Sequence, residues 1–186
     1  MNILQWLDYH VLLVLTGLGG TSVARDKIVY FTAEIVPFVA IGAGVWILMS
    51  GKTEAESQRN QDVVIASLGA LLLAIGARLL IGSQFLRLRP YVQYPELHSV
   101  YLPNTTNVSF PSMHALLLFT FAAVVYFEGR WRKLGIALFV LATLVILARV
   151  VAAVHYPSDV IGGAAIGIGI GWLVAKQIAW MRRQLS

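Results

Sequence analysis

The chain has 186 residues, of which 58% are hydrophobic and only 12% are charged. Several apolar runs are long enough to cross a bilayer core of roughly 30 Å, so the composition predicts an integral membrane protein. The formal net charge is +5, but the basic residues lie in short clusters between apolar runs, which argues against the continuous basic face of a nucleic-acid-binding protein. The chain has no cysteine, so disulfide bonds and thiolate metal sites are excluded.

The first segment is weakly amphipathic. Residues 2–18 carry a partial helical stripe of apolar side chains that Asp8 and His10 interrupt. We expect residues 1–20 to form a short helix that lies at the membrane interface or inserts shallowly, with a sixth membrane span as the alternative. The segment has neither a basic n-region nor a small-residue cleavage site, so it does not resemble a signal peptide that is removed.

Five longer apolar segments follow, each near the length that a bilayer requires. They cover roughly residues 28–50, 61–82, 113–128, 134–153 and 159–181. Pro37 is expected to kink the first of them. The predicted fold class is therefore all-α: one membrane-embedded domain over residues 1–186, a polytopic helix bundle with five or six transmembrane helices.

The basic residues of the connections indicate an orientation. Three connections or ends carry most of them, at Lys52, Arg59, Arg130, Arg132, Lys133, Arg182 and Arg183. For five consecutive spans these residues fall on one side, which the positive-inside rule assigns to the cytoplasm. The opposite side then holds the loop 83–112, and a loop of that length is usually functional.

Three polar segments on this opposite side carry arginines and histidines. In the first, Arg89 precedes Pro90, so we expect a helix to end there and to present the guanidinium near the membrane surface. The planar fork of donors on an arginine matches phosphate oxygens. Taken alone, Arg87 and Arg89 are better explained by contacts with lipid headgroups than by a phosphate site.

The second segment, Phe110-Pro111-Ser112-Met113-His114, opens the next span. Ser112 is expected to cap this helix, and the free backbone N–H groups of its first turn, around Met113, form an anion site. His114 would lie beside any anion held there.

The third segment begins with Arg149, which lies inside an apolar helix and therefore needs a partner or an aqueous cavity. His155 and Asp159 follow. A carboxylate that accepts the Nδ1–H of an imidazole leaves Nε2 as a nucleophile or base. The structural alternative is a His–Asp bond that only stabilises a helix junction.

The order Arg-Pro, Pro-Ser-x-His and Arg-x5-His-x3-Asp resembles the signature of the type 2 phosphatidic acid phosphatase superfamily, which contains membrane-embedded, metal-independent lipid phosphatases. The resemblance implies that His155 attacks phosphorus to form a phosphohistidine, that Asp159 orients it, and that His114 protonates the leaving group and then activates water. It also implies that four groups hold the phosphoryl oxygens: Arg89, Arg149, Ser112 and the backbone around Met113. No metal ion or other cofactor is implied.

Three positions depart from the pattern of this superfamily: Gly82 replaces a lysine, Met113 a glycine and Ala148 a serine. In the absence of this lysine and in the sequences around the motifs, the chain most resembles bacterial undecaprenyl-pyrophosphate phosphatases. We therefore expect a phosphatase at the outer face of a bacterial inner membrane, whose partners are its isoprenoid substrate and the bilayer. The alternatives are phosphatidylglycerophosphate, phosphatidic acid or a lipid A phosphate as substrate and, in a different class, a non-catalytic lipid-phosphate binder or transporter.

Two further arginines are candidate substrate-binding residues. Arg87 is expected to reach the second phosphoryl group of a pyrophosphate. Arg78 lies one helical turn before Gly82 and either extends into the vacant lysine position or pairs with Glu34 of the preceding span. Because helical side chains lean towards the N-terminus of their helix, the ion pair with Glu34 is favoured.

Overall fold

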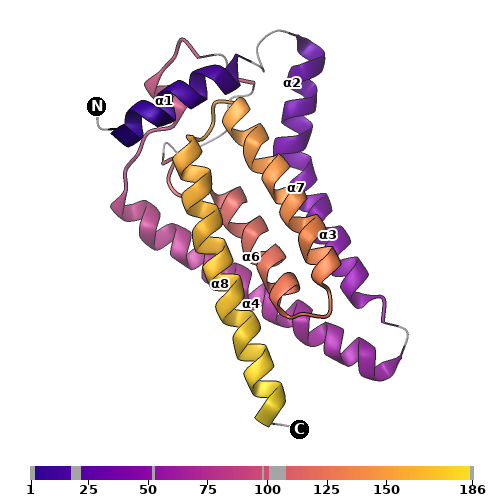
Figure 1. The fold of residues 1–186 in the computed structure, drawn as a ribbon. Helices are drawn as coiled ribbons and strands as arrows, with labels where there is room; N and C mark the ends of the chain where they lie inside the picture. The colour runs from indigo at the N-terminus through magenta and orange to yellow at the C-terminus, as the bar shows by residue number, and fades with distance from the viewer. Residues whose placement is uncertain (1–2, 18–21, 52, 98, 101–107, 185–186) are drawn as a thin grey trace.

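The computed structural model describes residues 3–17, 22–51, 53–97, 99–100 and 108–184. In chain order the elements are α1 (Ile3–Thr16), α2 (Val23–Tyr30), the π-helix η1 (Phe31–Ile35), α3 (Val36–Met49), α4 (Glu54–Gln84), α5 (Pro90–Gln93), α6 (Met113–Phe127), α7 (Arg132–Val151) and α8 (Pro157–Gln184). Part of the predicted N-terminal segment, Lys52, and residues 101–107 of the predicted long loop lie outside the described residues. Within the described ranges the elements are helical, as predicted (Figure 1).

Four helical stretches of the described chain are long and apolar enough to cross a membrane, which identifies a multi-pass membrane protein. They are Val23–Met49, which runs through α2, η1 and α3, and the helices α4, α7 and α8. The fifth predicted span, α6, has 15 residues and is about 22 Å long, so it is shorter than a bilayer core. Ten of its residues are buried, because α4, α7 and α8 pack around it. A helix surrounded by protein does not have to match the thickness of the lipid.

The irregularity expected at Pro37 takes the form of a π-helical turn. Proline has no N–H to donate, so the regular helical hydrogen bonds are interrupted there. The N–H of Val36 instead donates to the carbonyl oxygen of Phe31, five residues back. Such π-bulges occur frequently at functional sites, and this one carries Glu34.

A stripe of small residues brings α8 against α6. Gly163, Gly167 and Gly171 recur at four-residue spacing and face the backbone of α6. A Cβ atom at Gly167 would lie 2.5 Å from the carbonyl oxygen of Leu116, so no larger residue fits without separating the helices. This close approach also brings the first turns of the two helices together, where the N–H of Ser112 donates to the carbonyl oxygen of Asp159 at 3.1 Å.

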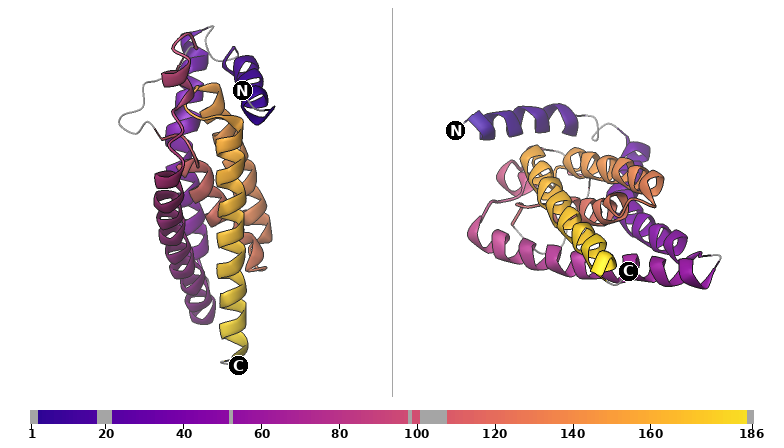
Figure 2. Two further views of the ribbon diagram at one scale, coloured as in Figure 1. Left: turned by 90° about the vertical axis from the view of Figure 1, so that its left-hand side faces the viewer. Right: turned by 60° about the horizontal axis from the view of Figure 1, so that its bottom comes forward.

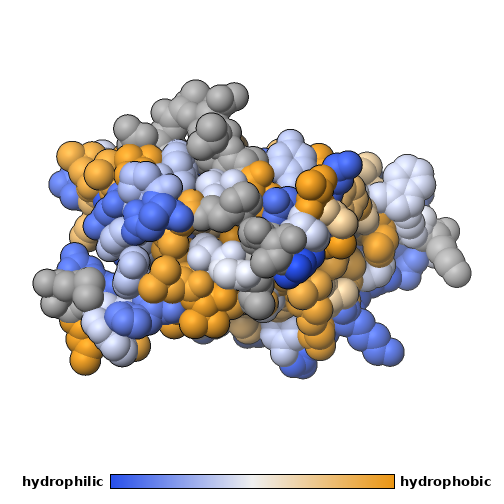
Figure 3. Space-filling view, turned by 90° about the horizontal axis from the view of Figure 1, so that it is seen from above, coloured by the Kyte–Doolittle hydropathy of each residue, from blue (hydrophilic) through white to orange (hydrophobic). Residues whose placement is uncertain are grey.

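The helix α1 lies across one end of the bundle, against α7 and α8, and is not among the four candidate spans (Figures 1 and 2). The described part of the N-terminal segment is thus a short helix of 14 residues. The three motif segments lie at this same end, and the space-filling view from above shows hydrophilic side chains beside apolar ones on it (Figure 3).

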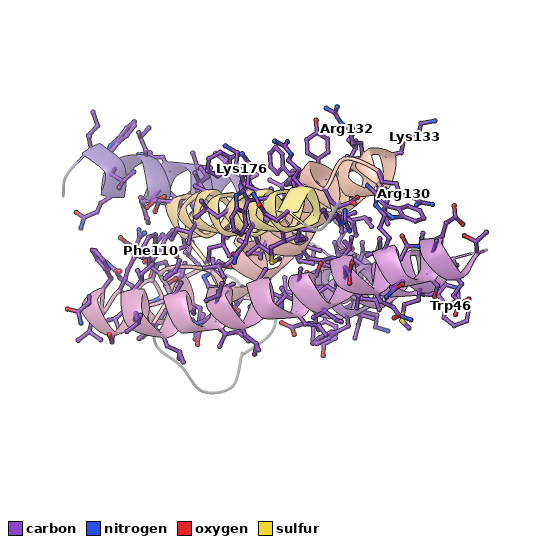
Figure 4. The ribbon with its side chains drawn as sticks, turned by 90° about the horizontal axis from the view of Figure 1, so that it is seen from below. Trp46, Phe110, Arg130, Arg132, Lys133 and Lys176 are labelled. Carbon is purple, nitrogen blue, oxygen red and sulfur yellow. The ribbon has the colours of Figure 1, made fainter. Side chains whose placement is uncertain are left out.

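The basic connections lie at the opposite end of the bundle. Arg130, Arg132 and Lys133 surround the turn between α6 and α7 (Figure 4). Three ion pairs among the described residues join this turn to its neighbours: Arg130 to Glu56 of α4 at 2.6 Å, Glu128 to Arg182 of α8 at 2.6 Å, and Glu128 to Arg59 of α4 at 3.6 Å. The predicted separation of the basic loops from the motif segments is thus present in the fold.

Candidate active site

A cavity of about 400 Å³ lies at the α1 end of the bundle, and the three motif segments meet in its wall. Five basic or imidazole side chains line it: Arg78, Arg89, His114, Arg149 and His155. They come from α4, the segment before α5, α6, α7 and the turn between α7 and α8. A hollow of this kind, lined by convergent polar groups among apolar helices, is the usual form of a ligand site.

Arg89 enters the cavity from an extended segment, which differs from the predicted helix end. The helix α4 already ends at Gln84, and Arg89 has extended backbone geometry immediately before the short helix α5. Pro90 explains the extended geometry of Arg89 and the start of α5, because proline disfavours helical geometry in the preceding residue and suits the first position of a new helix. The guanidinium of Arg89 is buried and donates to the carbonyl oxygen of Val154 at 3.2 Å.

Arg149 lies in the last turn of α7 with only 3% of its surface exposed. It forms an ion pair with Glu34 of η1, so this buried cation has a carboxylate partner and also lines the cavity. Sequence reasoning missed this pairing, because it had assigned Glu34 to Arg78.

The favoured ion pair between Arg78 and Glu34 is wrong. The guanidinium of Arg78 lies beside Gly82, and its Nη2 donates to the carbonyl oxygen of Val108 at 3.2 Å. Two causes account for this arrangement: Glu34 is engaged by Arg149, and Gly82 has no side chain to prevent Arg78 from turning towards the end of its helix. A similar depth in the membrane did not determine which helix faces Glu34.

The N-terminus of α6 lies where it was predicted, but the expected capping hydrogen bond is not formed. Ser112 is the N-cap residue, yet its side chain makes no capping hydrogen bond. Its hydroxyl is buried and has no hydrogen-bond partner among the described residues. Met113 and His114 follow in the cavity wall, so the N–H groups of this first turn lie next to the imidazole.

His155 sits in the tight turn between α7 and α8, where Ala153 adopts a positive φ of 59°. Only 2% of His155 is exposed. Burial, helped by the positive charges of Arg149 and Arg89, lowers the pKa of His155 to about 4, so this imidazole is neutral near pH 7.

The predicted direct bond between His155 and Asp159 is replaced by a bridge. Nδ1 of His155 lies 3.7 Å from Oδ2 of Asp159, which is too long for a hydrogen bond. The hydroxyl of Ser109 lies between them: it donates to Oδ2 of Asp159 at 2.5 Å and is 3.4 Å from Nδ1 of His155. Sequence reasoning missed Ser109, although its place just before the second motif was a signal.

Arg87 does not line the cavity, so its predicted role as a substrate ligand is not supported by the geometry. Its Nη1 donates to Asp159 at 2.9 Å and to the hydroxyl of Ser158 at 2.7 Å, and its guanidinium stacks 3.8 Å from the ring centre of Tyr156. Asp159 also accepts from the N–H of Tyr156 at 2.9 Å, as an acid in the first turn of a helix commonly does. Arg87 therefore holds Asp159 in place.

Asp8 completes this group from α1 and was not predicted. It is 3% exposed and accepts three hydrogen bonds: from Nη2 of Arg87 at 2.6 Å, from the hydroxyl of Ser158 at 2.5 Å and from the N–H of Ser158 at 2.9 Å. This N–H belongs to the first turn of α8, which leaves donors without helical partners. Asp8 thus docks α1 onto α8. Its interruption of an otherwise apolar stripe was the available signal.

Comparison with known proteins agrees with this arrangement. Residues 63–183 match the PAP2 superfamily. The chain is 29% identical over 170 residues to the bacitracin transport permease protein BcrC of Bacillus licheniformis, covering 91% of this chain and 77% of that protein. It is 26% identical over 169 residues to the undecaprenyl-diphosphatase BcrC of Bacillus subtilis (strain 168), covering 90% and 82%. The crystal structure of Aquifex aeolicus LpxE shares the fold, with a TM-score of 0.74, 22% identity and coverage of 91% and 95%.

Proposed function

This chain belongs to the PAP2 superfamily, and we propose that it is a metal-independent phosphatase that hydrolyses undecaprenyl pyrophosphate to undecaprenyl phosphate and inorganic phosphate. The observation that carries the proposal is the convergence of two imidazoles, His114 and His155, with Arg89 and Arg149 on one cavity. Phosphoryl transfer depends mainly on aligning a nucleophile and on stabilising the charge of the phosphoryl oxygens. These four side chains supply both requirements.

In the first step we assign the attack to Nε2 of His155. The hydroxyl of Ser109 donates to Asp159 and so turns a lone pair towards Nδ1–H of His155, which leaves the lone pair of the imidazole on Nε2. A bond forms between Nε2 and the terminal phosphorus while the bond from that phosphorus to the bridging oxygen breaks. His114 donates a proton to the bridging oxygen, and undecaprenyl phosphate departs.

In the second step His114 accepts a proton from water, and the resulting hydroxide attacks the phosphohistidine. The bond from phosphorus to Nε2 breaks, inorganic phosphate leaves, and both imidazoles return to their starting states. Throughout, Arg89 and Arg149 hold the non-bridging oxygens, together with the Ser112 hydroxyl and the N–H of Met113 at the N-terminus of α6. Glu34 keeps the guanidinium of Arg149 in place before the substrate arrives.

The choice of substrate rests on the sequence relatives. The similarity to a relative named undecaprenyl-diphosphatase extends over most of this chain and most of that relative. Phosphatidylglycerophosphate, phosphatidic acid or a lipid A phosphate would pass through the same two steps. We place the site at the outer face of a bacterial inner membrane, because the basic connections lie at the other end of the bundle.

A second candidate function is the non-catalytic binding or transport of a lipid phosphate, and one relative is named a bacitracin transport permease protein. Transport of a lipid phosphate requires binding groups such as Arg89 and Arg149. It does not require a neutral, buried imidazole that is oriented by a hydroxyl and a carboxylate. The presence of that arrangement favours catalysis.

The test is phosphate release from undecaprenyl pyrophosphate by the purified protein, by His155→Ala and by His10→Ala. His10 is an exposed histidine on α1 that bonds to the carbonyl oxygen of Trp6, so it is a matched control. We expect His155→Ala to lose turnover while His10→Ala keeps it, since only the former removes the attacking group. Near wild-type phosphate release by folded His155→Ala would refute the mechanism.

A further inference from the structure

The guanidinium of Arg78 occupies the space where a side chain at position 82 would begin. A Cβ atom built on Gly82 would lie 1.9 Å from Nη1 of Arg78, whereas the next nearest group, the carbonyl oxygen of Phe110, would be 3.6 Å away. Arg78 and Gly82 are one turn apart on α4 and both line the cavity. The guanidinium therefore reaches the cavity wall through a gap that only glycine leaves open.

No carboxylate of the described residues contacts Arg78. Among the described residues no acidic side chain lies within ion-pair distance of it, and its one hydrogen bond is from Nη2 to the carbonyl oxygen of Val108. Arg78 is half-buried in a helix that crosses the membrane. A cation in such a place is costly unless it faces something anionic or an aqueous cavity, and it is a functional candidate for that reason.

Two other arginines at this end are held by carboxylates. Arg149 is paired with Glu34, and Arg87 is held by Asp8 and Asp159. Arg78 differs from both, because it brings a positive charge to the wall that carries His114 and His155, and its side chain contacts no acid among the described residues.

We propose that Arg78 binds the phosphoryl group that is transferred, and that Gly82 is the space through which its guanidinium reaches that group. The ligand is the terminal phosphate of a phosphate ester or a pyrophosphate. This assignment rests on the proposed function, because it requires that the cavity holds a phosphoryl group. Arg78, one turn before Gly82, would then supply the positive charge that the glycine at position 82 cannot provide.

The position of Gly82 allows Arg78 to be displaced without being mutated. In Gly82→Ala the new methyl group collides with the far end of a flexible side chain, so the guanidinium moves and the backbone does not have to. Arg78→Ala removes the group altogether. Arg59→Ala is the control, because Arg59 lies on the same helix, its side chain is 51% exposed, and it pairs with Glu128 outside the cavity.

We would measure kcat/KM for undecaprenyl pyrophosphate, inhibition by orthovanadate, and the rise in melting temperature that inorganic phosphate produces. Loss of one charged hydrogen-bonding group predicts a decrease of about tenfold to a hundredfold in kcat/KM for Arg78→Ala, with weaker vanadate inhibition and less stabilisation by phosphate. Gly82→Ala is expected to behave in the same way, and Arg59→Ala to behave like the wild type.

The double variants separate binding from a structural role. Because both single changes remove the same guanidinium, Arg78→Ala with Gly82→Ala is expected to be no worse than Arg78→Ala alone. Arg78→Ala with Gly82→Lys is expected to recover part of the lost activity and of the phosphate stabilisation, because it returns a cation to the cavity. A purely structural contact with Val108 would not be restored by that lysine.

The inference is overturned if folded Arg78→Ala keeps wild-type kcat/KM and wild-type stabilisation by phosphate, or if the losses of the two single variants add. If the wild-type protein cleaves no lipid phosphate but is stabilised by phosphate in a manner that depends on Arg78, the proposed function fails and the inference stands.

Discussion

Removal of the Asp8 carboxylate is expected to weaken the attachment of α1 to the bundle. Asp8→Ala deletes the acceptor of the Ser158 N–H at the start of α8, a loss comparable to that of a helix cap, about 1–2 kcal/mol. It also deletes one partner of Arg87, whose side chain is 26% exposed and keeps Asp159, so we assign about 1–2 kcal/mol to that pair. The expected decrease in the free energy of unfolding is therefore about 2–4 kcal/mol.

The assay is thermal unfolding of the purified protein in detergent, with Asp8→Asn as the matched variant. For a chain of this size each kcal/mol shifts Tm by about 2–4 °C, so Asp8→Ala is expected to lower Tm by roughly 5–15 °C. Asp8→Asn keeps one acceptor oxygen and is expected to lower it less. A Tm for Asp8→Ala equal to that of the wild type would refute the role of Asp8 in docking α1.

Three other predictions concern the chemistry. Ser109→Ala is expected to change kcat more than KM, because it removes the bridge between His155 and Asp159. The decrease in kcat is expected to be smaller than for Asp159→Ala, because the carboxylate remains. Unchanged steady-state kinetics would contradict this. Burial lowers the pKa of His155 to about 4, so the imidazole stays unprotonated as the pH falls from 6.5 towards 4. The loss of kcat/KM that protonation of His155 causes is therefore expected at a pH well below 6.5. A loss at or above pH 6.5 that depends on His155 would be inconsistent with its burial. Phosphate release is expected to continue in excess chelator, and complete loss that magnesium restores would disprove a metal-independent mechanism.

The residues that the sequence identified are those whose identity and spacing carry chemistry. His155, His114, Arg89 and Arg149 were predicted from short segments, and the fold brings all four to one cavity. The spans were predictable because a bilayer demands about 20 apolar residues from each helix that faces lipid. The shorter α6 departs from that rule because protein surrounds it.

The relations that were missed or wrong depend on which helices face one another. The pattern of apolar residues indicates the depth of Arg78 and Glu34 in the membrane but not the neighbouring helix that each side chain faces, so Glu34 was given the wrong partner. Likewise, Ser109 reaches the 3.7 Å gap between His155 and Asp159 from a segment 46 residues before His155. Asp8 contacts Ser158 across 150 residues of sequence, and no local pattern specifies such a contact.

The most direct test of the central claim is a comparison of kcat/KM for four substrates of the same purified protein in the presence of chelator. They are undecaprenyl pyrophosphate, phosphatidylglycerophosphate, phosphatidic acid and a lipid A phosphate. We predict the highest kcat/KM for undecaprenyl pyrophosphate, with turnover that depends on His155. A higher kcat/KM for any of the three other lipids would contradict the assigned substrate, and no hydrolysis of any of them would contradict the assignment as a phosphatase.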